Sequence, residues 1–391
     1  MASLINFGQQ WQLATSTRDN LIFSTASIFV DDFTVYAFHR HSDGQALKYD
    51  VSQDGGQTFP VVRSTAKTTS ADDMIAARTT SFAGVPFRVL LLQEALGLLY
   101  SDTVLTLPET SVWTQITLPG SLVGAPLGLE VAGANVQVFG QSGGGGAAKT
   151  WHSEDGGTTF AGPVNVGTET VTTATGPNHL CSPSAGLWCL INKGAIFRSA
   201  DNGASWTPAA VHTITAGNVA CPASSAIFAV SATRLVACFK GQVATSDDAG
   251  ATWTDRQNLT LNPPSTTSIN QGALVAFASF GSHAGVPVLG AATVYPHEFT
   301  GAITRGAFWR SVDLGTTWTL VDCVGGTNLA STGQRVIAFI ARGGRGLMDL
   351  QEGGGPNRAT FFNPNTDVAA VAARRTPSAS SFTVRPCFQP C

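Results

Sequence analysis

The chain has 391 residues with a net charge of −3, a hydrophobic share of 43% and 42 glycines. This composition excludes an intrinsically disordered chain, and without a basic excess no nucleic-acid partner is expected. No apolar run reaches about 18 residues, so no membrane-spanning helix is expected, and the many glycines with few charges predict a β-rich protein with tight turns.

The first twenty residues contain neither a basic start nor an apolar stretch of about 7–15 residues, so no signal peptide is expected. Trp11 lies in a short segment that we expect to pair with the last strands of the chain, near residues 382–388. Such pairing of the two ends would leave no free sheet edge.

Five segments share the pattern Ser-x-Asp-x-Gly-x-(Thr/Ser)-(Phe/Trp), and we call them the octapeptide turns, with positions numbered 1 to 8. They are residues 52–59, 153–160, 199–206, 246–253 and 311–318. The position-3 aspartates are Asp54, Asp155, Asp201, Asp248 and Asp313.

The residue types of the octapeptide predict a hairpin turn. The aspartate side chain can accept hydrogen bonds from backbone N–H groups of its own turn, and the glycine two positions later supplies a positive φ. An alternating stretch such as ALKYDVS or GAFWRS precedes each turn, which is typical of a strand. The repeating unit is therefore strand, aspartate-centred turn, strand.

The aspartates are spaced by 101, 46, 47 and 65 residues, and a period near 47 is typical of a four-stranded blade of a β-propeller. The interval of 101 predicts a degenerate turn at Ser101-Asp102, with Trp113 as its returning aromatic residue. The segment 335–362 looks like a further blade with its turn rewritten around Asp349. We therefore predict an all-β propeller of seven blades, or else six, formed by residues 1–391 as a single domain.

The octapeptides resemble the Asp-box, or bacterial neuraminidase repeat, of sialidases and other Asp-box propellers, and the resemblance covers residues 23–362. It implies four-stranded antiparallel blades with the boxes at the outer rim, away from a central substrate site. A sialidase-like site would hold a substrate carboxylate with three arginines and would use a tyrosine nucleophile, a glutamate and an acidic aspartate.

Only part of that site has a counterpart here. The resemblance matches Arg40 to a substrate-side arginine, Asp43 to the acid, and Glu298 with Arg305 to the glutamate and second arginine. Ser24 stands where the first arginine is expected, and no tyrosine follows Tyr295. Because loss of a nucleophile usually costs many orders of magnitude in rate, we do not expect a sialidase of the usual kind.

Other residues are candidates for ligand contacts. His39 and His41 flank Arg40 and could line a polar groove, with a solvated strand end as the alternative. Trp188 and Trp309 are candidates for stacking on a sugar, and the blade core is an equal alternative for Trp309. No metal site or cofactor is expected. Cys181 and Cys189 flank a short turn and could face each other across a hairpin, either as buried thiols or as a disulfide.

These features favour a non-catalytic recognition propeller that binds a glycan or another surface ligand, with a virion or phage surface, or another extracellular place, as the expected location. A sialidase-like glycoside hydrolase with a rearranged site, using Glu298 and Asp43, is the first alternative. The second is an assembly propeller that docks protein partners, in a homo-oligomer or a virion.

Overall fold

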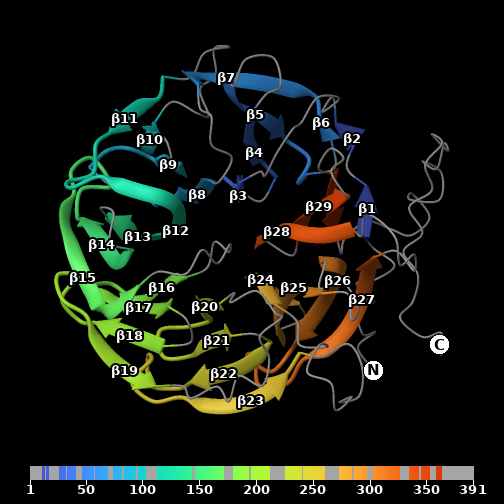
Figure 1. Cartoon of the computed structure of the whole chain (residues 1–391). Coiled ribbons are helices and arrows are strands. Elements are labelled where there is room, and N and C mark those ends of the chain that lie inside the picture. Colours follow the sequence, from blue (N-terminus) through green and yellow to red (C-terminus); the bar gives the residue numbers. More distant parts are fainter. Residues whose placement is uncertain are drawn as a thin grey trace.

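The computed structural model is all-β (Figure 1). It describes residues 11–13, 15–16, 26–31, 33–40, 46–56, 58–68, 74–81, 83–93, 96–102, 112–142, 146–170, 179–192, 195–211, 225–239, 241–259, 273–283, 286–296, 303–325, 334–342, 345–352 and 358–362. Within these ranges no helix occurs, and therefore none that is long and apolar enough to cross a membrane.

The described strands form seven four-stranded antiparallel sheets and one short parallel pair. From the innermost to the outermost strand, the first three sheets are sheet 1 with β3 (Ala26–Phe29), β4 (Val35–Arg40), β5 (Ala46–Ser52) and β7 (Val61–Thr68); sheet 2 with β8 (Met74–Arg78), β9 (Val89–Gln93), β10 (Gly97–Ser101) and β11 (Thr114–Ile116); and sheet 3 with β12 (Leu122–Ala132), β13 (Asn135–Ser142), β14 (Ala147–Ser153) and β15 (Ala161–Thr170).

The other four sheets repeat this plan. They are sheet 4 with β16 (Leu180–Ser184), β17 (Leu187–Asn192), β18 (Ala195–Ser199) and β19 (Thr207–Val211); sheet 5 with β20 (Ser225–Ala229), β21 (Leu235–Phe239), β22 (Gln242–Ser246) and β23 (Thr254–Asn258); sheet 6 with β24 (Ala273–His283), β25 (Val286–Pro296), β26 (Ile303–Ser311) and β27 (Thr319–Gly325); and sheet 7 with β28 (Gln334–Arg342), β29 (Arg345–Glu352), β30 (Arg358–Phe362) and β1 (Trp11–Leu13). The parallel pair is β2 (Thr15–Ser16) with β6 (Thr58–Phe59).

The sheets stand around a common centre (Figure 1). Each innermost strand contacts the innermost strand of the next sheet, and β28 contacts β3, so the circle closes. This arrangement confirms the predicted fold class, an all-β propeller with four-stranded antiparallel sheets. Spacing of the octapeptides had indicated seven units, and the described part of the chain holds seven four-stranded sheets.

Sheet 7 takes its outermost strand from the other end of the chain. Trp11 of β1 pairs with Phe362 of β30. The predicted pairing of this segment with residues 382–388 falls on residues that lie outside the described part of the chain. The prediction of a turn around Asp349 is wrong, because this residue lies inside β29 and pairs with Ala338 and Ala359. Since β1 supplies the fourth strand, the third strand is β30, and any turn after it starts beyond Phe362.

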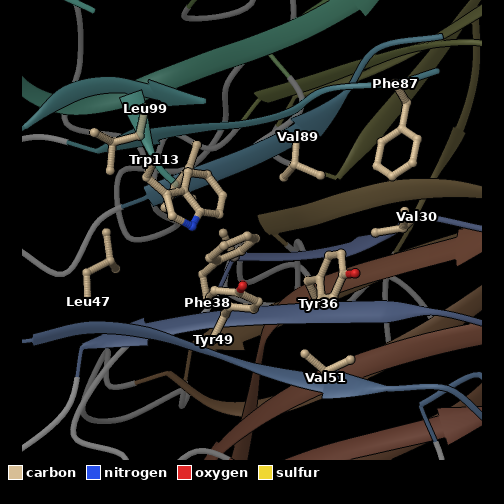
Figure 2. Close-up of a cluster of buried hydrophobic side chains, with 12 residues drawn as sticks. Val30, Tyr36, Phe38, Leu47, Tyr49, Val51, Phe87, Val89, Leu99 and Trp113 are labelled. Atoms are coloured by element: carbon tan, nitrogen blue, oxygen red, sulfur yellow. The ribbon is translucent and has the colours of Figure 1, made fainter. Parts of the chain in front are cut away.

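The degenerate unit at Ser101 is confirmed. Ser101 pairs with Val89 as Ser153 pairs with Val136 in the next sheet. The returning Trp113 is buried between sheets 1 and 2 (Figure 2).

Aromatic side chains fill the space between these two sheets (Figure 2). The ring of Trp113 lies edge-on to Phe38, with ring centroids 5.6 Å apart, and 6.0 Å from Tyr49. Strand residues such as Phe38 and Leu91 are fully buried, because each sheet is covered by its neighbours on both sides. Truncating a buried aromatic residue to alanine typically costs about 3–5 kcal/mol, so these contacts are a main source of stability.

The position-5 glycines of four octapeptide turns pack against the preceding sheet. At Gly250 (φ +86°) a Cβ atom would lie 2.6 Å from Sγ of Cys189, and at Gly315 (φ +82°) it would lie 2.4 Å from a methyl group of Val236. Gly203 and Gly157 meet Gln137 and Leu90 in the same way. Glycine is therefore required at this position for two reasons: the backbone is left-handed, and the neighbouring sheet approaches too closely for a Cβ atom.

We expect Gly250→Ala to destabilise the protein more than Gly186→Ala. Gly186 also has a positive φ (+77°), but nothing lies within 4 Å of its added Cβ, so it isolates the backbone cost of about 1–2 kcal/mol. Gly250→Ala should lose about 1–3 kcal/mol more through overpacking against Cys189. Chemical unfolding of both variants measures the difference, and equal losses would contradict the close-approach explanation.

Candidate functional site

The connections between strands divide the ring into two faces. Because successive strands are antiparallel, the turns after the first and third strands of a sheet lie on one face, which we call the turn face. The connections after the second and fourth strands join the opposite face, which we call the loop face. All five octapeptide turns follow third strands and therefore belong to the turn face.

The octapeptide turns share one hydrogen-bond pattern, as the residues 246–253 illustrate. Ser246 Oγ donates to Asp248 Oδ1 at 2.8 Å and accepts from the Gly250 amide at 2.8 Å. The Thr252 amide donates to Oδ1 at 2.8 Å, and its hydroxyl donates to Oδ2 at 2.6 Å. Both carboxylate oxygens of the aspartate are thus engaged within its own turn, as the residue types predicted.

These bonds change the acidity of the aspartates. Burial by itself would raise the pKa of Asp155, Asp201, Asp248 and Asp313, but hydrogen bonds from the hydroxyl and amide at position 7 and from the position-1 serine outweigh it and lower the pKa. A carboxylate held ionised in this way is suited to a structural turn rather than to proton transfer.

A side chain from the preceding sheet binds the position-4 carbonyl of four of the turns. Arg88 Nη1 donates to Gly156 O at 3.0 Å, and Gln137 Nε2 donates to Asn202 O at 2.7 Å. The other two pairs are Arg198 Nε with Ala249 O at 3.2 Å and Arg234 Nε with Leu314 O at 2.9 Å. The octapeptide turns therefore connect neighbouring sheets.

Arg88 makes the most extensive of these connections. Its guanidinium holds Asp102 through two bonds of 2.6 and 2.9 Å, reaches Thr158 Oγ1 at 2.7 Å in the next sheet, and lies 3.8 Å from the centre of the Tyr100 ring. The arginine is only 5% exposed. A buried, bidentate Arg–Asp pair of this kind fixes geometry well.

Arg234 repeats the arrangement three sheets further on. It donates to Asp247 Oδ1 at 2.7 Å and to Thr316 Oγ1 at 2.7 Å. Arg88 and Arg234 each precede the second strand of their sheet by one residue, and Asp102 and Asp247 each follow the last residue of the third strand. Sequence reasoning missed this pair of sites, because the equivalence is visible only once the strands are in register.

The two tryptophans predicted to stack on sugars are buried. Trp188 is 0% exposed and donates from Nε1 to Asn202 Oδ1 at 2.9 Å, while Trp309 is 4% exposed and donates to Thr293 Oγ1 at 2.9 Å. Both side chains pack in cores between sheets. Their prediction as exposed contact residues is wrong, because their strand positions face a neighbouring sheet.

His39 is also removed from the surface. The side chain is 2% exposed, its Nδ1 lies 3.4 Å from Ala37 O, and the same atom lies 4.0 Å from Asp50 Oδ1. A ligand on the surface cannot reach this imidazole, so its prediction as a groove residue is wrong for the same reason as for the tryptophans.

The remaining predicted residues fall on the loop face or outside the described part of the chain. Arg40 is the last residue of β4, and Arg305 lies near the start of β26, where it pairs with Tyr295. Both backbone positions are at the loop face, on sheets 1 and 6, with sheet 7 between them. His41, Asp43 and Glu298 lie outside the described residues.

The two cysteines of sheet 4 face each other across a hairpin, as predicted. Cys181 and Cys189 are partners across the hairpin of β16 and β17, and both are buried free thiols. Burial raises the pKa of Cys189 to about 12 and also raises that of Cys181. Thiols in this state are poor nucleophiles. Among the residues that the structure describes, no group of three or more His, Cys, Asp and Glu side chains could hold a metal ion.

A closed ring of four-stranded antiparallel sheets around a common centre defines a β-propeller. No protein-family model and no curated protein sequence matches the chain. Solved structures do match. YCF48 from Cyanidioschyzon merolae is 13% identical with a TM-score of 0.51, and the match covers 91% of this chain and 100% of that one.

Two further structures resemble the chain at similar levels. The extracellular domain of the hybrid two-component system BT3049 from B. thetaiotaomicron is 10% identical with a TM-score of 0.53, covering 94% of this chain and 42% of that one. Raptor from Chaetomium thermophilum is 9% identical with a TM-score of 0.54, covering 90% and 29%. At these identities the likeness shows the propeller fold alone.

We expect Arg88→Ala to lower the free energy of unfolding by about 3 kcal/mol, since it leaves Asp102 and a buried carbonyl without their donor. Arg234→Ala should cost less, because Asp247 is 74% exposed whereas Asp102 is 32% exposed. Denaturant unfolding of the two variants gives the comparison. A larger loss for Arg234→Ala would contradict this ranking.

Proposed function

We propose that this chain is a non-catalytic recognition propeller of the Asp-box type, formed by residues 1–391 as one domain, that binds a surface ligand with its loop face. The observation that carries the proposal is the difference between the two faces: the turn face holds neighbouring sheets together, and the loop face carries connections of variable length. On the turn face, the octapeptide turns bind the neighbouring sheets, and their aspartates are engaged within the turns.

The loop face has the opposite character. Its connections range in length from the two residues 240–241 to the segments 212–224 and 259–272, whereas the octapeptide turns all have one length. Connections of variable length on a rigid scaffold are where binding sites usually occur. Arg40 and Arg305 have their backbones at this face and supply donors suited to an anionic or polar ligand.

The ligand class in this proposal is a glycan or another surface ligand, and the proposed setting is a virion or phage surface. With Trp188 and Trp309 in the core, recognition of a sugar would depend on polar groups such as these arginines. A propeller that docks protein partners remains the second alternative. The glycoside hydrolase alternative rests on Glu298 and Asp43, and the sequence argument against it is that no tyrosine follows Tyr295.

A glycan array tests the proposal directly. We expect the protein to bind at least one glycan, and the double variant Arg40→Ala/Arg305→Ala to bind it at least about tenfold more weakly, equivalent to about 1.4 kcal/mol. Glu154→Gln is the matched control, because Glu154 is exposed on the turn face and should not affect binding.

Four results would redirect the proposal. Failure to bind any glycan at high protein density contradicts the lectin form, and equal loss from the Glu154→Gln control contradicts the assignment to the loop face. Hydrolysis of a fluorogenic sialoside or another glycoside that Glu298→Gln abolishes would establish the enzyme instead. A stoichiometric protein partner or a symmetric oligomer would favour the assembly propeller.

A further inference from the structure

We propose that Glu130 and Gln137 form a proton-dependent junction between sheets 3 and 4, which is tight when the Glu130 carboxyl group carries its proton. The inference concerns the fold and does not depend on the proposed ligand. It rests on a row of polar side chains that faces the octapeptide turn of residues 199–206.

The row crosses three strands of sheet 3. Glu130 of β12 is the cross-strand partner of Gln137 on β13, and Gln137 is the partner of His152 on β14. Directly paired residues point to the same face of a sheet, with Cβ atoms about 4.5–5.5 Å apart. The face is that of sheet 4, because Gln137 contacts the turn of that sheet.

Gln137 is the central member of the row. It is 0% exposed, and its Nε2 donates to Asn202 O at 2.7 Å, so this end of the amide must be the nitrogen. The amide lies directly against Gly203, where an added Cβ would fall within 3 Å of all three amide atoms. The opposite atom, Oε1, is buried and accepts no hydrogen bond from the described residues. Leaving a buried acceptor unsatisfied typically costs about 1–3 kcal/mol.

Glu130 can supply the donor that Oε1 needs. Burial raises the pKa of Glu130 to about 7, an effect that a hydrogen bond involving the Val131 backbone partly opposes. A neutral carboxyl group has an O–H donor, whereas the carboxylate only accepts and would repel the amide oxygen. The protonated form thus links Glu130 through Gln137 to the carbonyl of Asn202 in the next sheet.

Other titratable groups of the described residues also face this junction. His152 lies across Gln137 on β14, and Cys181 of β16 interacts electrostatically with Glu130. Glu154 contacts the other partner of the junction, since its Oε1 accepts a hydrogen bond from the Asn202 side-chain Nδ2 at 2.8 Å. Glu154 is exposed whereas Glu130 is half-buried, so Glu154 provides a more accessible acidic neighbour of the same junction.

The direction of the pH effect follows from the two states of Glu130. Its ordinary pKa is 4.5, and the folded value is about 7, so the folded protein binds the proton more tightly than the unfolded chain does. The contribution to stability is therefore complete below about pH 4.5 and is lost as the pH rises to about 7 and beyond. The junction should loosen on the alkaline side.

Amide hydrogen exchange tests the junction in the whole chain. After correction for intrinsic exchange, protection of residues 199–206 should fall at least about tenfold in the wild-type protein between pH 5.5 and pH 8. Glu130→Gln should keep its protection at both pH values, because the glutamine amide donates at every pH. Glu154→Gln, the control, should follow the wild-type profile.

Two outcomes would overturn the inference: protection of residues 199–206 in the wild-type protein that is independent of pH, or a Glu130→Gln variant with the wild-type pH dependence. Should Glu130→Gln fold poorly, the wild-type profile alone still decides the first point. A carboxyl titration of Glu130 by NMR, expected near pH 7, then decides the second, and a midpoint near 4.5 would contradict it.

Discussion

The ring depends on the contacts that four of the octapeptide turns make with the sheet before them. The position-5 glycine lets the preceding sheet approach to a distance that no Cβ would allow, and the position-4 carbonyl next to it accepts a hydrogen bond from the same sheet. The turn's own aspartate holds the backbone in the required shape. A motif of eight residues thereby holds two neighbouring sheets together, and the same contact recurs at several positions around the ring.

Other properties of the chain follow from this constraint. Sheets packed on both sides need apolar strands, which explains why only 12% of residues are charged. Two buried arginines, Arg88 and Arg234, are tolerated because each has an aspartate and turn oxygens within hydrogen-bond distance. Because the turns on one face hold the sheets together, the connections on the opposite face can vary in length.

The donor that meets the position-4 carbonyl differs from sheet to sheet, and this difference gives each junction its own chemistry. Arginine donors are insensitive to pH over the physiological range. The Gln137 amide is also neutral at every pH, but the residue stands beside Glu130 on the neighbouring strand, and its Oε1 atom is the one that lacks a donor among the described residues. In our proposal, the junction between sheets 3 and 4 is a place where a titrating group acts on the ring.

The repeat, the chemistry of the turn and the all-β propeller could be predicted from the amino-acid sequence alone. The hydrogen bonds of the turn lie within eight residues, and the spacing of the repeats indicates the propeller. Only the tertiary structure decided which side chains meet the turns, since those partners lie between 51 and 80 residues away. For the same reason the sequence did not show that Trp188 and His39 are buried, left the core as one of two positions for Trp309, and did not identify Phe362 as the partner of Trp11. Burial and strand pairing depend on the register of neighbouring sheets, which no local pattern encodes.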